Sequence, residues 1–162
     1  MGQNMNVNQI DVQTRLDLLE LPHRAADAVI WKNADQYADC FTADAAWDPR
    51  PLWPTRIEGG RSAIRAVFPE MCAGLDFALQ GIFSVRIIAY TGSQAKLRTY
   101  LLELGRAKGT QLAPVGFGMY EDDCVMEDGI WRMRLHKLTP LYFGSADWLE
   151  PIHLNWPPRQ QP

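Results

Sequence analysis

The sequence predicts an α+β fold in which a curved antiparallel sheet is wrapped by N-terminal helices and encloses a cone-shaped cavity. Two observations lead to this prediction. Apolar residues recur at helical spacing only in the first half of the chain, whereas β-rich runs separated by hairpin turn signals follow Gly74. Strands joined by short turns form an antiparallel meander, and the earlier helices must cover its apolar face. A curved sheet covered on one side leaves a hollow suited to a small molecule.

Helices are expected before the sheet. Between residues 11 and 41 apolar side chains recur every three or four positions, as in a helix with one apolar face. Pro22 interrupts this pattern and predicts a kink or a break, with a short helix over 33–41 after it. A second helix signal begins at Gly59-Gly60-Arg61-Ser62, where we expect Ser62 to cap the helix.

Strands follow from runs of β-branched, aromatic and aliphatic residues between turn signals. A brief strand precedes a proline-rich loop, and four long strands follow the last helix. The turns between the long strands are Thr91-Gly92-Ser93, the glycine-bounded segment 105–109 and Asp128-Gly129. The expected strands cover residues 43–47, 77–90, 95–104, 114–127 and 130–141.

The 162 residues have the length of one domain, which we place at 10–145, with a flexible N-terminus at 1–9 and an irregular C-terminal tail at 146–162. Hydrophobic residues make up 47% and charged residues 22%, as in a globular domain with a core. The net charge of −3 comes without a basic stripe, so no nucleic-acid partner is expected.

Membrane spans and export signals are not expected either. The apolar runs fall short of the ~20 residues that a membrane helix needs, and residues 1–10 lack the basic start and apolar core of a secretion signal. These features predict a cytoplasmic protein. Cys40, Cys72 and Cys124 are widely spaced, which favours buried reduced thiols. No metal-binding or phosphate-loop motif is present, so we expect neither a metal nor a cofactor.

Three stretches resemble the SnoaL-like branch of the NTF2-like superfamily. They are YADCFTADAAWD (37–48), EGGRSAIRAVF (58–68) and GMYEDDCVMEDGIWRM (118–133). The resemblance implies the NTF2-like fold and a homodimer or homotrimer. Members of this superfamily include polyketide cyclases, scytalone dehydratase, limonene epoxide hydrolase, ketosteroid isomerase, dehydrochlorinases and non-catalytic binding proteins. The fold therefore does not decide the chemistry.

The chain departs from the functional positions of these relatives. The helix acid of the dehydratases and dehydrochlorinases falls on Ile30, and their histidine falls near Gly81, in a strand with no histidine. The Arg-x-Asp of the epoxide hydrolases falls on Arg98-Thr99-Tyr100, and their last-strand acid falls on His136. The base of ketosteroid isomerase falls near Asp48.

Arg98, Tyr100 and His136 form the first candidate catalytic group. Arg98 and Tyr100 are two residues apart on a strand and share a face, and His136 on the last strand is placed to converge with them in the hollow. An imidazole, a phenol and a guanidinium together suit proton transfer with stabilisation of an oxyanion. Alternation leaves another arrangement open, with His136 on the outer face beside Arg132 and Arg134. Arg98 and Tyr100 likewise suit an exposed face or a subunit interface.

His23 and Asp27 form a second candidate catalytic pair. They are four residues apart on the first helix, so the carboxylate can orient the imidazole. Surface pairs of this kind are common, and on a helical wheel both residues lie at the margin of the apolar arc.

Aromatic and polar residues provide the candidate substrate-binding groups. The tail residues Trp148, His153 and Trp156 are expected to belong to an aromatic rim, a lid or a subunit contact. Glu103 and Asp122 are further polar groups for the hollow. The predicted binding residues are Trp47, Asp48, Trp53 and Tyr120.

Together these patterns predict a cofactor-independent lyase, dehydratase, isomerase or cyclase that uses acid–base chemistry on an aromatic or polycyclic, hydrophobic small molecule. The alternatives are an epoxide hydrolase-like enzyme and a non-catalytic protein that binds small molecules or takes part in an assembly.

Overall fold

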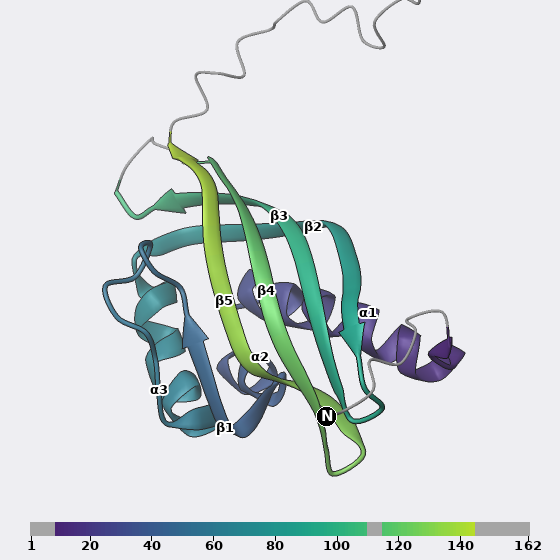
Figure 1. The fold of residues 1–162 in the computed structure, drawn as a ribbon. Helices are drawn as coiled ribbons and strands as arrows, with labels where there is room; N and C mark the ends of the chain where they lie inside the picture. The colour runs from purple at the N-terminus through teal and green to yellow at the C-terminus, as the bar shows by residue number, and fades with distance from the viewer. Residues whose placement is uncertain (1–8, 110–114, 145–162) are drawn as a thin grey trace, which may run out of the picture.

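A computed structural model describes residues 9–109 and 115–144. Three helices and five strands follow one another along the chain (Figure 1). The helices are α1 (Val12–Ile30), α2 (Ala34–Asp39) and α3 (Gly60–Ala73). The strands are β1 (Phe41–Asp48), β2 (Leu75–Tyr90), β3 (Gln94–Ala107), β4 (Val115–Glu127) and β5 (Ile130–Gly144).

Helices α1 and α3 begin in different ways. Asp11 caps α1 by accepting a hydrogen bond of 2.9 Å from the Thr14 amide, and α1 continues through Pro22 without ending. α3 begins at Gly60, with Gly59 at a φ of +96° as its N-cap. The expected cap at Ser62 is wrong, because the helix already starts at Gly60, where the lack of a Cβ lets the chain pass close to the Ala43 carbonyl of β1.

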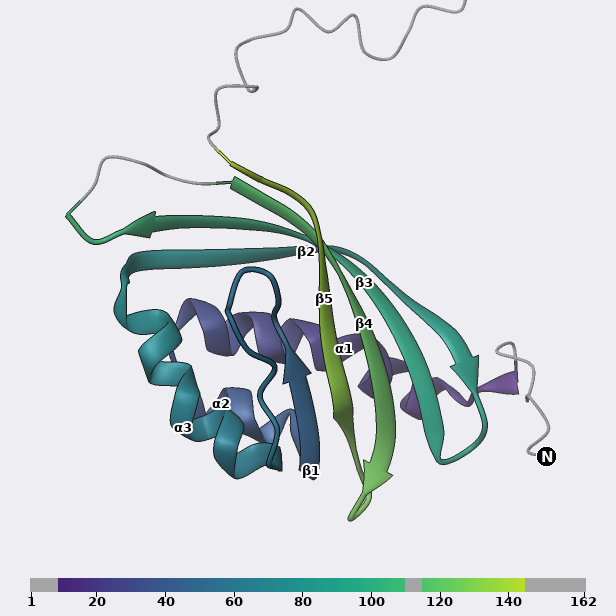
Figure 2. The ribbon, with the colours of Figure 1, turned by 60° about the vertical axis from the view of Figure 1, so that its left-hand side comes forward.

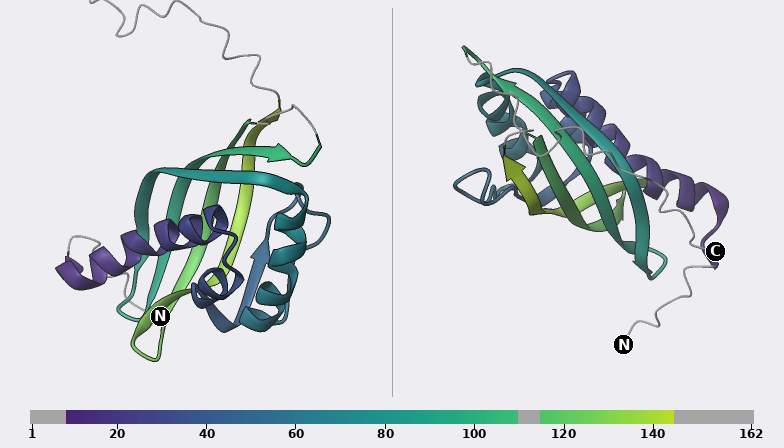
Figure 3. Two further views of the ribbon diagram at one scale, coloured as in Figure 1. Left: turned by 180° about the vertical axis from the view of Figure 1, so that it is seen from behind. Right: turned by 90° about the horizontal axis from the view of Figure 1, so that it is seen from above.

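The sheet has the order β1-β5-β4-β3-β2, and it curves around the helices on its concave face (Figures 2 and 3). The four long strands form the expected antiparallel meander. β1 lies parallel to β5 at the edge, so the sheet is mixed, and the α+β prediction is confirmed with this correction.

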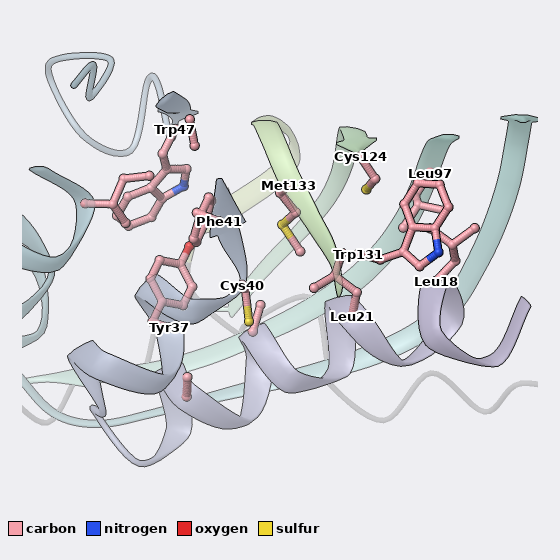
Figure 4. Close-up of a cluster of buried hydrophobic side chains, with 14 of the residues drawn as sticks. Leu18, Leu21, Tyr37, Cys40, Phe41, Trp47, Leu97, Cys124, Trp131 and Met133 are labelled. Atoms are coloured by element: carbon pink, nitrogen blue, oxygen red, sulfur yellow. The ribbon is translucent and has the colours of Figure 1, made fainter. Parts of the chain in front are cut away.

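The main core lies between α1, α2, α3 and the concave face of the sheet. Tyr37, Phe41 and Trp47 group at one end, and Leu97 and Trp131 lie at the other (Figure 4). The three cysteines are free and buried, as the spacing predicted. In the described part of the chain, no helix combines the length and apolar character needed to cross a membrane.

The convex face of the sheet is not covered by any described helix and exposes large apolar side chains, including Phe83 at 66% and Leu79 at 44% of their surface. The homodimer or homotrimer implied by the sequence resemblance stays a prediction.

Candidate active site

A cavity of about 200 Å³ lies between the concave face of the sheet, α2, α3 and the loop after β1. Its wall is largely aromatic and aliphatic, which suits an apolar ligand. Among the described residues that line it, none is a lysine, an arginine or a histidine. The larger apolar lining residues include Tyr37, Trp47, Trp53, Phe68, Leu138 and Phe143.

Three polar side chains from neighbouring strands meet in this wall. Gln80 on β2 lies directly opposite Glu103 on β3, and Tyr120 follows on β4. The Gln80 side chain interacts with both the Glu103 carboxyl and the Tyr120 phenol and lowers the pKa of each, against the larger effect of burial. The wall therefore presents one carboxyl, one amide and one phenol to an otherwise apolar space.

Burial changes the acidity of two of these groups. It raises the pKa of the Glu103 carboxyl, so this group keeps its proton to higher pH than an exposed glutamate does. Burial raises the pKa of Tyr120 as well, and the nearby acidic groups of Glu103 and Asp122 raise it further. Tyr120 is thus a neutral phenol at any physiological pH, able to donate a hydrogen bond but unable to act as a phenolate base.

His136 lies directly behind Tyr120 and is buried, with 4% of its surface exposed. Its Nδ1 is 2.5 Å from Oδ1 of Asp122, which is its partner in the β4–β5 register. The Tyr120 ring stacks on the imidazole at 3.8 Å between centroids, and Phe41 packs edge-on at 5.7 Å. A carboxylate on Nδ1 and rings on two sides fix the orientation of the imidazole.

A β-bulge explains why His136 faces inward. Trp131 and Met133 are buried on the concave face, and continued alternation would place Leu135 inside and His136 outside. The β4–β5 register shifts after the Cys124–Met133 pair, so that Asp123 pairs with Leu135. This extra residue in β5 reverses the alternation and turns His136 to the core. The outer-face alternative for His136 is therefore excluded.

A second, smaller cavity of about 10 Å³ adjoins His136 and is lined also by Thr99 and Asp122. Tyr37, Gln80 and Tyr120 line both cavities. Within the described residues, Oδ2 of Asp122 and Oγ1 of Thr99 are buried without a hydrogen-bond partner. Two unpaired oxygens around a space of this size suit a single water molecule.

Arg98 and Tyr100 lie on the convex face of the sheet, so the expectation that they converge with His136 is wrong. Leu97, Thr99 and Leu101 occupy the inward positions of β3. Arg98 pairs with Glu121 at 3.2 Å, and Tyr100 exposes 38% of its surface. Strand alternation fixes this outcome, since neighbours of inward residues must point outward.

His23 and Asp27, the second candidate catalytic pair, lie on the solvent side of α1 and do not face the hollow. The His23 Nδ1 is 3.0 Å from the Leu19 carbonyl oxygen, and Asp27 accepts a hydrogen bond of 2.9 Å from the Gln36 amide. The inward face of α1 is taken by apolar residues such as Leu21.

Of the predicted binding residues, Trp47, Trp53 and Tyr120 line the main cavity. Asp48 does not, because its two carboxylate oxygens are each 2.7 Å from the Arg50 guanidinium in the loop that carries Trp53. Asp48 thus holds the loop. The tail residues Trp148, His153 and Trp156 lie outside the described residues. Gln80, Tyr37 and Thr99 were not predicted, although Gln80 is a lone amide in an apolar run.

The Asp48–Arg50 pair predicts an acid-sensitive contribution to stability. Hydrogen bonds from Arg50 lower the pKa of Asp48 to about 2 from an ordinary value of 3.8. A lowered pKa adds stability that is complete above about pH 4 and is lost as the pH falls towards about 2. We expect Arg50→Ala to have a lower unfolding temperature than the wild type above pH 4. This difference in unfolding temperature should disappear as the pH falls from about 4 to about 2.

Thermal unfolding of both proteins across this pH range, followed by circular dichroism, checks the prediction. Arg65→Ala, which removes an exposed ion pair with Asp35, is the control and should show a small gap to wild type. A gap for Arg50→Ala that stays constant down to the lowest pH would contradict the assignment.

Comparison with solved structures shows the same fold in several proteins. A protein of Novosphingobium aromaticivorans that is provisionally named an aromatic ring hydroxylase has a TM-score of 0.77 at 23% identity, over 85% of this chain and 96% of its own. A provisionally named scytalone dehydratase from the same organism has a TM-score of 0.70 at 16% identity, over 78% and 83%. A type 2 hexachlorocyclohexane dehydrochlorinase (LinA) has a TM-score of 0.76 at 15% identity, over 91% and 96%.

Identities this low show a shared fold and leave the chemistry of the chain open. Among curated proteins, no match is found. The SnoaL-like domain matches residues 11–137, which span both the helices and the sheet that form the cavity. The chain therefore belongs to the SnoaL-like domain family.

Proposed function

We propose that this protein is a cofactor-independent enzyme of the lyase, dehydratase or isomerase type that moves protons on an apolar, aromatic molecule in the main cavity. The observation that carries the proposal is the buried Asp122–His136 pair behind the cavity wall. A carboxylate bonded to Nδ1 orients an imidazole and stabilises the imidazolium that forms when the ring takes a proton. The names of the dehydrochlorinase and the provisional dehydratase among the structural relatives support the same class.

In this proposal His136 acts on a ligand across the wall that the two cavities share. Gln80 and Tyr120 line both spaces, and the smaller space has room for one water beside Thr99 and Asp122. A general base acts efficiently through one such water. In this proposal the proton leaves a ligand carbon, passes through the water and arrives on the imidazole.

The charge left on the ligand is stabilised by the neutral phenol of Tyr120. Its raised pKa keeps the hydroxyl protonated, so it donates to a developing oxyanion at the cavity wall. Tyr120 takes the role that the sequence had assigned to Arg98 and Tyr100, which point away from the cavity.

The experiment is exchange of an acidic C–H proton in heavy water. β-Tetralone is an uncharged aromatic ketone, and NMR follows the loss of its benzylic α-proton signal. We expect the wild type to accelerate this exchange and His136→Gln to lower the enzymatic rate by ~10²–10⁴-fold, the usual contribution of a general base. His23→Gln, which changes the exposed histidine, should exchange at the wild-type rate.

Exchange that is no faster than in buffer, or that is equally fast in His136→Gln, would overturn the proposal. Circular dichroism and unfolding temperatures of both variants ensure that a loss of rate reflects the site and not the fold.

Non-catalytic binding is the second candidate, and the mainly apolar wall together with Ile30 at the position of the family acid favours it. It predicts that β-naphthol quenches the fluorescence of cavity tryptophans such as Trp47 while β-tetralone shows no accelerated exchange. The epoxide hydrolase alternative loses support, since Arg98 and Tyr100 lie outside the cavity.

A further inference from the structure

Glu103 is a titratable group of the main cavity that the proton path through His136 does not use. We propose that Glu103 is the general acid that protonates a leaving hydroxyl group of the ligand, which makes the protein a dehydratase. This inference rests on the proposed function, because His136 must first remove the proton from carbon.

The geometry singles out this carboxyl. Among the described residues that line the main cavity, Glu103 is the one carboxylic acid, and no cation stands beside it in the wall. Its partner is the uncharged Gln80 amide, opposite it in the β2–β3 register. By contrast, Asp48, Asp123 and Glu127 each have a lysine or an arginine within 4.0 Å.

This environment favours the protonated carboxyl. An apolar site without a cation disfavours the carboxylate, and burial accordingly raises the pKa of Glu103. A carboxylic acid kept neutral in an apolar pocket is a general acid, while a second group in a different environment acts as the base. Asp122–His136 provides that second group on the other side of Tyr120.

The reaction that these two groups support is the dehydration of a β-hydroxy carbonyl compound. The proton on the α-carbon passes to His136, and its electron pair forms the C=C bond. The C–O bond to the β-hydroxyl breaks, and that oxygen takes the proton of Glu103 and leaves as water. The imidazolium and the carboxylate that remain return to their starting states when one proton moves back through solvent.

The test compares two probes that need different groups. Exchange on β-tetralone needs the base His136 and the hydrogen-bond donor Tyr120 but no acid for a leaving group. Dehydration of the β-hydroxy ketone that yields benzylideneacetone needs such an acid as well. We expect Glu103→Gln to lower the dehydration rate, followed by the ultraviolet absorbance of the product, by ~10²-fold or more, and to lower the exchange rate by a much smaller factor. His136→Gln should lose both activities.

Glu121→Gln is the matched control, because Glu121 is a carboxylate on the convex face of the same sheet, paired with Arg98. It should leave both rates unchanged. Equal dehydration by wild type and Glu103→Gln would overturn the acid role while the proposed function stands. Dehydration and exchange that fall by the same factor in Glu103→Gln would overturn it too, since the variant would then have lost the site as a whole.

A direct measurement of the proton keeps the inference testable even if neither probe reacts. The infrared band of a protonated carboxylic acid, identified by its loss in Glu103→Gln, should persist as the pH rises above 4.5, the ordinary value for glutamic acid. A Glu103 carboxyl that titrates at or below that value would overturn the inference whatever the activity shows. If the band persists and the wild-type protein exchanges β-tetralone but does not dehydrate the β-hydroxy ketone, the dehydratase assignment is overturned and the proposed function stands.

Discussion

Substitution of Gly60 by alanine is expected to lower the free energy of unfolding by about 3 kcal/mol. Gly60 has a φ of +77°, in the left-handed region that costs an L-residue roughly 1–2 kcal/mol. A Cβ at this position would lie 1.8 Å from the carbonyl oxygen of Ala43, which is a backbone atom of β1 and cannot rotate away. α3 must therefore move off β1, at a further cost of about 1–3 kcal/mol.

Gly129→Ala is the matched control for this prediction. Gly129 has the same φ of +77°, but nothing lies within 4 Å of its added Cβ, so only the backbone strain remains. We expect it to cost about 1 kcal/mol. Urea unfolding of the two variants and the wild type measures the difference, and equal losses would show that the close approach of α3 to β1 does not matter.

The consequence of Gly60→Ala extends to the cavity. α3 contributes Phe68 to its wall and β1 contributes Trp47, so displacement of one element from the other reshapes the space for a ligand. The glycine at the first position of α3 is thus a packing requirement between the helix and β1.

Much of the fold could be predicted from the sequence because most of its elements are regular. Helical spacing gave α1 and α2, and turn signals separated the four long strands near their observed ends. The parallel pairing of β1 with β5 could not be predicted, since it joins segments far apart in the chain and the pattern within β1 does not encode a direction.

Strand alternation predicts the orientation of the site residues correctly in β3 but not in β5. In β3 alternation places Leu97, Thr99 and Leu101 on the inward face, as the structure shows. The resemblance to epoxide hydrolases instead favoured Arg98, which lies on the outward face. In β5 the same rule would have placed His136 outside, and only the bulge after Met133 brings it in. A bulge depends on the pairing of two strands and left no signal in the residues of β5.

Replacement of Asp122 by alanine is expected to cost about 3 kcal/mol in the free energy of unfolding, because it removes one partner of a buried pair. Asp122 exposes 1% of its surface, and its Oδ1 is 2.5 Å from Nδ1 of His136. Without that oxygen a buried ring N–H loses its acceptor, and a cavity opens beside Thr99.

The neighbouring residue supplies the control. Asp123 follows Asp122 on β4 but points to the convex face, where it pairs with Lys96 at 2.6 Å and with 64% of the lysine side chain exposed. An exposed pair contributes about 0–1 kcal/mol, so Asp123→Ala should change the free energy of unfolding little. The same substitution one residue apart therefore separates the two faces of the sheet. Equal losses would show that the Asp122–His136 pair does not stabilise the fold. Asp122 would then not explain the fixed orientation of His136, on which the proposed proton transfer depends.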